Sequence, residues 1–121
     1  MRRRSLKTLK QDREALPVRD EYRRLYPWCQ RSDCDRLATD VHEIARGPAR
    51  NKAIEVRACL LHLCRAHHDD MDDYSQWPIA RQLALKKYSD PEGYDRVAVN
   101  LIRGRAPEAI TEEEVDRFSH S

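Results

Sequence analysis

The sequence predicts a single α+β domain, in which a small two-stranded unit carries a metal site and helices flank it. Three observations favour this class. Two pairs of metal-ligating residues lie a few tens of residues apart, two short β-patterned runs lie between them, and the C-terminal third repeats apolar residues at helical spacing. The chain has 121 residues, of which 40% are hydrophobic and 36% are charged. It can bury a modest but lean core, which favours helices and a metal staple.

The N-terminal part is predicted to be a basic arm followed by a helix. Residues 1–10 hold five cations and no acid, a charge pattern that suits contact with phosphate backbones, although a solvated, disordered terminus fits equally well. A helical pattern then runs from about Gln11 to Tyr26 and restarts at Pro17. Pro27 ends it, because the residue before a proline is pushed out of the α region.

The middle part is predicted to contain two strands and a helix. Asp40–Ile44 alternates polar and β-branched residues, and Leu60–Leu63 is a short apolar run that leads into the second ligand pair. Gly47 and Pro48 mark a turn or loop between them. A helix is expected from Arg65 to about Tyr74, with acidic residues near its start where they suit the helix dipole.

The C-terminal part is predicted to be a helical appendage that packs or interacts rather than catalyses. Pro78–Tyr88 has the pattern of an amphipathic helix with proline in its first turn. Asp90 and Pro91 are interpreted as the start of a second helix, and Thr111–Glu114 is a capping box for a third. The domain is thus divided into an arm and helix (1–26), a metal-stabilised core (27–75) and the appendage (76–121).

The two ligand pairs predict a structural zinc site of three thiolates and one imidazole. Their spacing is Cys-x4-Cys, 29 intervening residues, and Cys-x2-His, and closed tetrahedral zinc sites are built from such pairs. In the cytoplasm thiols stay reduced, which favours metal ligation over disulfides. The alternative is a set of isolated buried cysteines with a surface histidine. His68 could replace its neighbour as a ligand, and Cys59 is interpreted as a buried thiol. The predicted ligands are Cys29, Cys34, Cys64 and His67.

A second group of residues predicts a catalytic metal site. His68 and Asp72 are four residues apart, so they would share one face of a helix, while His42 and Glu43 lie on the preceding strand. Imidazole and carboxylate ligands suit a divalent ion that keeps positions open for water and phosphate. The alternative is a hydrogen-bonded histidine with solvated acids. The predicted ligands of this ion are His42, His68 and Asp72.

Taken together, these residues resemble the HNH endonucleases of the ββα-metal type, in particular small phage and prophage proteins with a His-Glu-Ile first motif. The resemblance rests on the first cysteine pair, on Val41–Ile44 followed by a glycine and a basic loop, and on Leu63–His68. It covers residues 28–73, and extends more loosely into the helical tail.

The resemblance implies a β-hairpin and helix wrapped around Mg²⁺ or Mn²⁺, with a zinc knuckle holding them together. It implies a metal-dependent DNA endonuclease of low sequence specificity, in which a strand histidine activates water. The expected catalytic residues are His42, Glu43 and His68. Depending on the register of the motif, the general base is either His42 or Glu43.

The chain departs from the family pattern at its central asparagine, whose position falls near Cys59. The orienting role of that asparagine is then either lost or taken by Asn51 or His62. This departure motivates an alternative function, a catalytically inactive zinc-stabilised module that binds DNA or serves phage-type assembly.

The expected partners are DNA and, by the same resemblance, phage packaging proteins. No apolar run approaches the roughly 18 residues of a membrane span, so we expect a cytoplasmic protein without a membrane partner. Cationic side chains in the arm and in the loop are expected to contact phosphates. They are Arg2, Arg3, Arg4, Arg46, Arg50 and Lys52.

Overall fold

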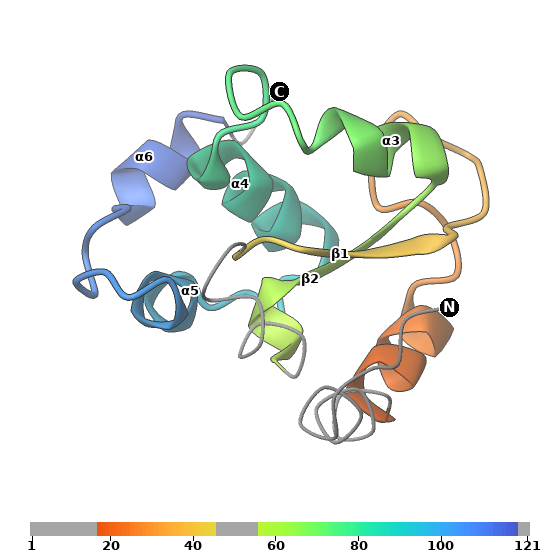
Figure 1. Ribbon diagram of the computed structural model, residues 1–121, viewed down its shortest axis with the longest axis horizontal. Helices are drawn as coiled ribbons and strands as arrows, with labels where there is room; N and C mark the ends of the chain where they lie inside the picture. Colours follow the sequence, from red (N-terminus) through yellow and green to blue (C-terminus); the bar gives the residue numbers. More distant parts are fainter. Residues whose placement is uncertain (1–16, 46–55, 119–121) are drawn as a thin grey trace, which may run out of the picture.

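The computed structural model describes residues 17–45 and 56–118, which combine helices with a small two-stranded sheet in an α+β arrangement (Figure 1). Residues 17–25 are helical. The elements that follow are β1 (Asp40–Glu43), the 3₁₀ turn η2 (Arg57–Cys59), β2 (Leu60–Leu63), α3 (Arg65–Asp70), α4 (Ile79–Ser89), α5 (Arg96–Ile102) and α6 (Glu112–Asp116). Both predicted strands are confirmed. None of the helices among these residues is long and apolar enough to cross a membrane.

The two strands pair antiparallel, and their alternation gives the hairpin two distinct faces. His42 lies opposite Leu61, and Val41 lies opposite His62; residues directly opposite each other share a face. One face packs on the N-terminal helix, because Val41 and Leu60 contact Tyr22. The other face is directed toward α3 and α4 (Figure 1). Its residues are Asp40, His42, Leu61 and Leu63.

Helix α4 lies at the centre of the fold and is buried around most of its circumference. Its prediction as a helix is confirmed, but the helix is buried more widely than one amphipathic face, because Gln82 and Lys86 are fully buried together with Leu83. Pro78 is the N-cap of this helix rather than part of its first turn. The buried polar side chains on α4 reach groups from other elements.

Lys86 is the main link between α4 and the rest of the core. Its ammonium donates to Tyr22 Oη at 2.9 Å, to the carbonyl of Leu60 at 2.7 Å and to Asp90 Oδ2 at 2.6 Å. Asp90 also accepts from Arg57 Nη2 at 2.8 Å. This polar network therefore joins the N-terminal helix, η2, β2 and α4 within an otherwise apolar core.

Two helix boundaries differ from the sequence prediction. α3 ends at Asp70, because the chain turns at Met71 and Asp72 instead of continuing to Tyr74. The helix expected to open at Asp90 begins at Arg96 instead. The Asp90 carboxylate accepts from the amide of Gly93 at 3.1 Å, but residues 91–93 form a turn that does not continue as a helix. Asp95 caps α5 by accepting from the amide of Ala98. The capping box of α6, formed by Thr111 and Glu114, is confirmed.

Candidate metal centre and adjoining histidines

The two predicted zinc-ligand pairs converge on one point. The four ligand atoms of Cys29, Cys34, Cys64 and His67 all lie within 4.8 Å of one another, and Cys29 Sγ is 3.4 Å from His67 Nδ1. Zn–S bonds of about 2.3 Å place tetrahedral ligand atoms about 3.8 Å apart. The cluster therefore has the spacing and the donor set of a site that could hold zinc, and its four cysteine and histidine members are those expected from the sequence.

The first pair is presented by a small loop that folds back on itself. Trp28 forms a β-bridge with Leu37, and the amide of Cys29 donates to the carbonyl of Arg36 at 2.9 Å. The amide of Cys34 closes a turn on the carbonyl of Arg31 at 3.1 Å. These backbone bonds fold the loop that carries the two thiols, and the amide of Gln30 attaches the same loop to β2 by donating to the carbonyl of His62 at 3.0 Å.

The second pair is presented by the first turn of α3. Cys64 is the N-cap, and its carbonyl accepts from the amide of His68 at 2.9 Å. His67 lies three residues after Cys64, so its ring is on the same side of the helix. Its neighbour His68 points elsewhere, which settles the choice between the two histidines: His67 joins the cluster.

Ionisation differs among the clustered thiols. Burial raises the pKa of Cys29 to about 11. Burial also opposes ionisation of Cys64, but the amide of His67 and the thiols of Cys29 and Cys34 donate to its sulfur, and its pKa is lowered. Metal ligation requires thiolates, and the donors around Cys64 favour its ionised form.

Cys59 is a buried thiol apart from the cluster, as predicted. Its side chain is fully buried, and burial raises its pKa to about 12. Its carbonyl accepts from the amide of Ile44 at 2.7 Å, next to the end of β1. None of the four cysteines forms a disulfide. Cys59 packs in the core and is not part of the ligand cluster.

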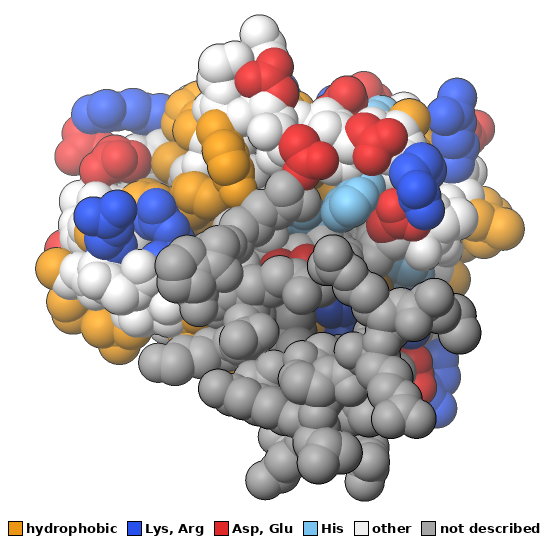
Figure 2. Space-filling model, in the orientation of Figure 1, with side chains coloured by type: hydrophobic (Ala, Val, Ile, Leu, Met, Phe, Trp, Pro, Cys, Tyr) orange, Lys and Arg blue, Asp and Glu red, His pale blue; other side chains and the backbone are white. Residues whose placement is uncertain are grey.

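His42 and His68 lie close together beside this cluster. Their ring centroids are 5.4 Å apart in an edge-to-face arrangement. His42 is fully buried, whereas the His68 side chain is 23% exposed. Figure 2 shows histidine side chains reaching the surface beside acidic side chains. The pair therefore spans from the core to a solvent-accessible face.

Asp40 is a member of this group that the sequence analysis did not single out. Its Oδ2 lies 3.3 Å from His68 Nδ1 and 2.7 Å from Arg65 Nε. Asp40 precedes His42 by two residues on β1, so both side chains leave the same face of the strand. Strand alternation was the sequence signal that could have identified it.

Glu43 and Asp72 are the two other carboxylates that the sequence placed in this site. Glu43 lies on the opposite face of β1, where it accepts from Arg19 Nη1 at 2.7 Å. Asp72 follows Met71, the C-cap of α3. Within residues 17–45 and 56–118, the cysteine–histidine cluster is the only group of three or more ligand atoms close enough to share an ion.

Gln82 contacts His42 and was also missed by the sequence analysis. Gln82 Oε1 is 2.7 Å from His42 Nε2, although the two residues are 40 positions apart. No local pattern could reveal this contact, because it depends on the packing of α4 against the hairpin. His62, one of the two residues expected to orient the catalytic group, lies on the other face, with Nδ1 2.6 Å from the carbonyl of Tyr26. Asn51, the other one, is outside the described residues.

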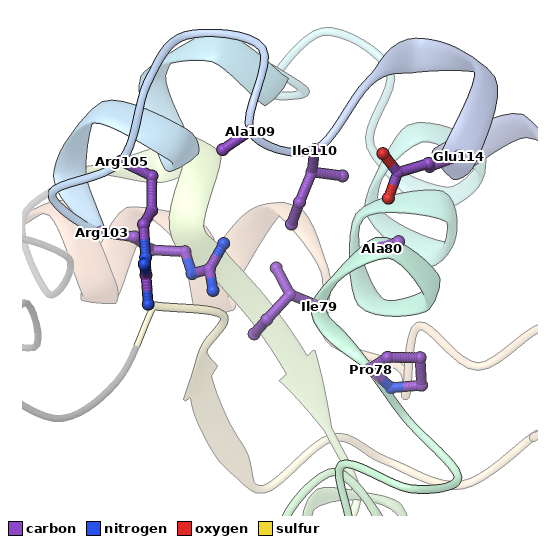
Figure 3. Close-up of a pocket in the computed structure, with 8 residues that line it drawn as sticks. All are labelled: Pro78, Ile79, Ala80, Arg103, Arg105, Ala109, Ile110 and Glu114. Atoms are coloured by element: carbon purple, nitrogen blue, oxygen red, sulfur yellow. The ribbon is translucent and has the colours of Figure 1, made fainter.

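The six cations predicted to contact phosphates, Arg2, Arg3, Arg4, Arg46, Arg50 and Lys52, lie outside the described residues. A groove of about 400 Å³ is present elsewhere, between the start of α4 and the segments around α5 and α6. Figure 3 shows Arg103 and Arg105 on one side of it, with Ile79 and Ile110 facing each other. It includes none of the predicted ligands.

Comparisons with known proteins do not assign the chain to a family. No family model matches it, and neither the curated proteins nor the solved structures contain a match.

Proposed function

We propose that this chain is a metal-dependent DNA endonuclease of the HNH type, stabilised by a structural zinc ion. The observation that carries the proposal is the juxtaposition of His42 and His68, 5.4 Å apart between ring centroids, with Asp40 at 3.3 Å from the second ring. These groups come from β1 and from α3, and the cysteine–histidine cluster joins the loop that precedes β1 to α3. A hairpin and a helix that share imidazoles and a carboxylate are the parts that the sequence resemblance leads us to expect.

In this proposal His68 and Asp40 would hold Mg²⁺ or Mn²⁺, and Asp40 would take the carboxylate role expected of Asp72. The ion would supply positive charge that polarises the phosphate and stabilises the leaving 3′ oxygen. His42 removes a proton from a water molecule, whose oxygen forms a bond to phosphorus as the bond from phosphorus to the 3′ oxygen breaks. Histidine suits this task because its pKa is near neutrality without further tuning.

In this proposal, cationic residues of the N-terminal arm and of the loop after β1 contact the DNA substrate. Arg46, Arg50 and Lys52 lie three to nine residues after the end of β1, the strand that carries His42, in the sequence. Contacts to phosphates position DNA without reading its bases. We therefore propose cleavage with low sequence specificity and binding that weakens strongly as salt is raised.

A plasmid-nicking assay in Mg²⁺ or Mn²⁺ tests the proposal. We expect His42→Ala and His68→Ala each to lower the nicking rate by at least the roughly 100-fold typical of losing a general acid–base group, while zinc content remains near that of the parent chain. His42→Ala should also lower the thermal stability, because it leaves the buried amide of Gln82 without this partner, so thermal unfolding checks that each variant is folded at the assay temperature. His62→Gln is the matched control, since its imidazole lies on the opposite face of the hairpin.

Nicking that survives in both alanine variants would refute the proposal. Salt-sensitive DNA binding by the parent chain with no cleavage in either metal would instead favour the inactive DNA-binding or assembly module.

A further inference from the structure

The amide of Gln82 is held in one orientation by two backbone carbonyls. Its Nε2 donates to the carbonyl of Trp77 at 2.9 Å and lies 3.4 Å from the carbonyl of Met71. Carbonyl oxygens accept and cannot donate, so the amide nitrogen must face them. The amide oxygen is thereby directed at His42 Nε2, at 2.7 Å.

This orientation determines which ring nitrogen of His42 carries the proton. An amide oxygen is an acceptor, so a hydrogen bond at 2.7 Å requires a proton on His42 Nε2. In the neutral ring the lone pair then lies on Nδ1. Both side chains are fully buried, and breaking this bond would leave two buried polar groups unpaired.

We infer that Gln82 is a positioning residue that holds His42 in its Nε2–H tautomer and makes Nδ1 the nitrogen that acts. The catalytic consequence rests on the proposed function: His42 accepts the proton from water, or ligates an ion, through Nδ1 and not through Nε2. Helix α4 thereby contributes to the site as well as to the core.

The surroundings of Gln82 make it suited to this role. It lies in the first turns of α4, whose N-terminal end follows Trp77 directly. One turn further along, Lys86 fixes the same helix to the N-terminal helix and β2. A side chain on an element fixed in this way orients its partner with little freedom to move.

Long-range ¹H–¹⁵N correlation spectra of the imidazole rings test the inference directly. In the neutral, metal-free site of the folded, zinc-loaded chain, we expect the Nε2 of His42 to show the shift of a protonated ring nitrogen and Nδ1 that of an unprotonated one. Gln82→Met removes the acceptor at similar length, and we expect it to mix the two tautomers. In Gln82→Glu, a protonated carboxyl keeps an O–H donor toward the two carbonyls and an oxygen acceptor toward His42, and we expect it to retain the tautomer.

The nicking assay supplies the second readout. We expect Gln82→Met to lower kcat by about 10- to 100-fold, the range typical of losing a partner that orients a functional histidine, with the KM for DNA unchanged. We expect Gln82→Glu to recover much of that loss. A parent chain with the proton on Nδ1, or a Gln82→Met variant with an unchanged tautomer or an unchanged kcat, would overturn the inference.

The two readouts separate this inference from the proposed function. If the parent chain does not cleave DNA but shows the Nε2–H tautomer that Gln82→Met loses, the proposed function fails and the assignment of Gln82 stands. If Gln82→Met does not fold, the tautomer of the parent chain and the behaviour of Gln82→Glu decide the question.

Discussion

Side-chain alternation on β1 decides which residues reach His42. Asp40 and His42 lie on the face toward α3 and α4, whereas Glu43 lies on the face toward the N-terminal helix, paired with Arg19. On β1, Asp40 therefore shares the face of His42, and Glu43 does not. Asp40 on the strand lies 3.3 Å from His68 Nδ1, nearer than Asp69 on α3, whose Oδ1 lies 4.0 Å from the same nitrogen.

Substitutions of Asp40 and Asp72 compare the two candidate carboxylate ligands of the catalytic ion. If Asp40 is the carboxylate ligand, Asp40→Asn should raise the Mn²⁺ concentration needed for half-maximal nicking by about 10-fold or more, because a neutral amide is a poor substitute for a carboxylate. Asp72→Asn should leave it within about two-fold. A metal titration of the nicking rate measures both, and the reverse order would return the role to Asp72.

The elements of this fold are joined through buried polar groups as well as apolar contacts. Lys86 on α4 is fully buried, and burial lowers its pKa to about 8. Burial opposes ionisation of Asp90 too, but bonds from Arg57, Lys86 and Tyr26 hold the pKa of its carboxyl well below the usual range. The stability from Asp90 is therefore present above the ordinary carboxyl pKa and is lost as the pH falls through its folded-state pKa.

Removing Asp90 should destabilise the domain far more than removing a surface acid. Asp90→Ala leaves a buried ammonium unpaired, for which a loss of about 3–5 kcal/mol in unfolding free energy is typical. Glu108→Ala breaks an exposed pair with Arg96, in which Glu108 is 65% exposed, and should cost at most about 1 kcal/mol. Urea unfolding at constant pH and zinc concentration measures both losses, and equal losses would contradict this account of α4.

Gly93 shows how closely these groups are packed. A Cβ added there would meet the Asp90 carboxylate and would lie 2.8 Å from Arg57 Nε. The turn that follows α4 therefore requires glycine for close approach. The buried network and the backbone around it form one packed unit.

At the scale of the whole molecule, the cysteine–histidine cluster joins a loop that precedes the hairpin to the helix that follows it. Such a site contributes about 10–16 kcal/mol of apparent binding energy in zinc-finger peptides, comparable to the roughly 5–15 kcal/mol stability of a whole domain. The described core is small, so occupancy of this site is expected to decide whether the chain is folded.

Removal of zinc tests whether the cysteine–histidine cluster stabilises the fold. We expect one zinc ion per chain, and a chelator strong enough to remove it should abolish the cooperative thermal transition. Cys64→Ser should lose zinc and stability together, whereas Cys59→Ala, a thiol outside the cluster, should retain zinc. Metal analysis with thermal unfolding measures both, and full stability of the zinc-free chain would contradict a structural role for the ion.

The sequence by itself determined the features that depend on short spacing. Cys64 and His67 are one helical turn apart, the two β-patterned runs form the hairpin, and Thr111 with Glu114 caps α6. The helical turn, the cap and the extended form of each strand follow from local backbone geometry, so a window of a few residues contains the information. The pairing of the two strands joins positions 17 to 23 residues apart and is not contained in such a window.

Only the tertiary structure decided what surrounds His42. Its bond to Gln82 joins positions 40 residues apart, and the bond between Asp40 and His68 depends on how α3 packs on the hairpin. The burial of the polar residues on α4 also depends on tertiary structure, because the partners of Lys86 come from other elements. These contacts depend on which faces of the elements pack together in the folded chain. The periodicity of one element does not show which face of another element it packs against.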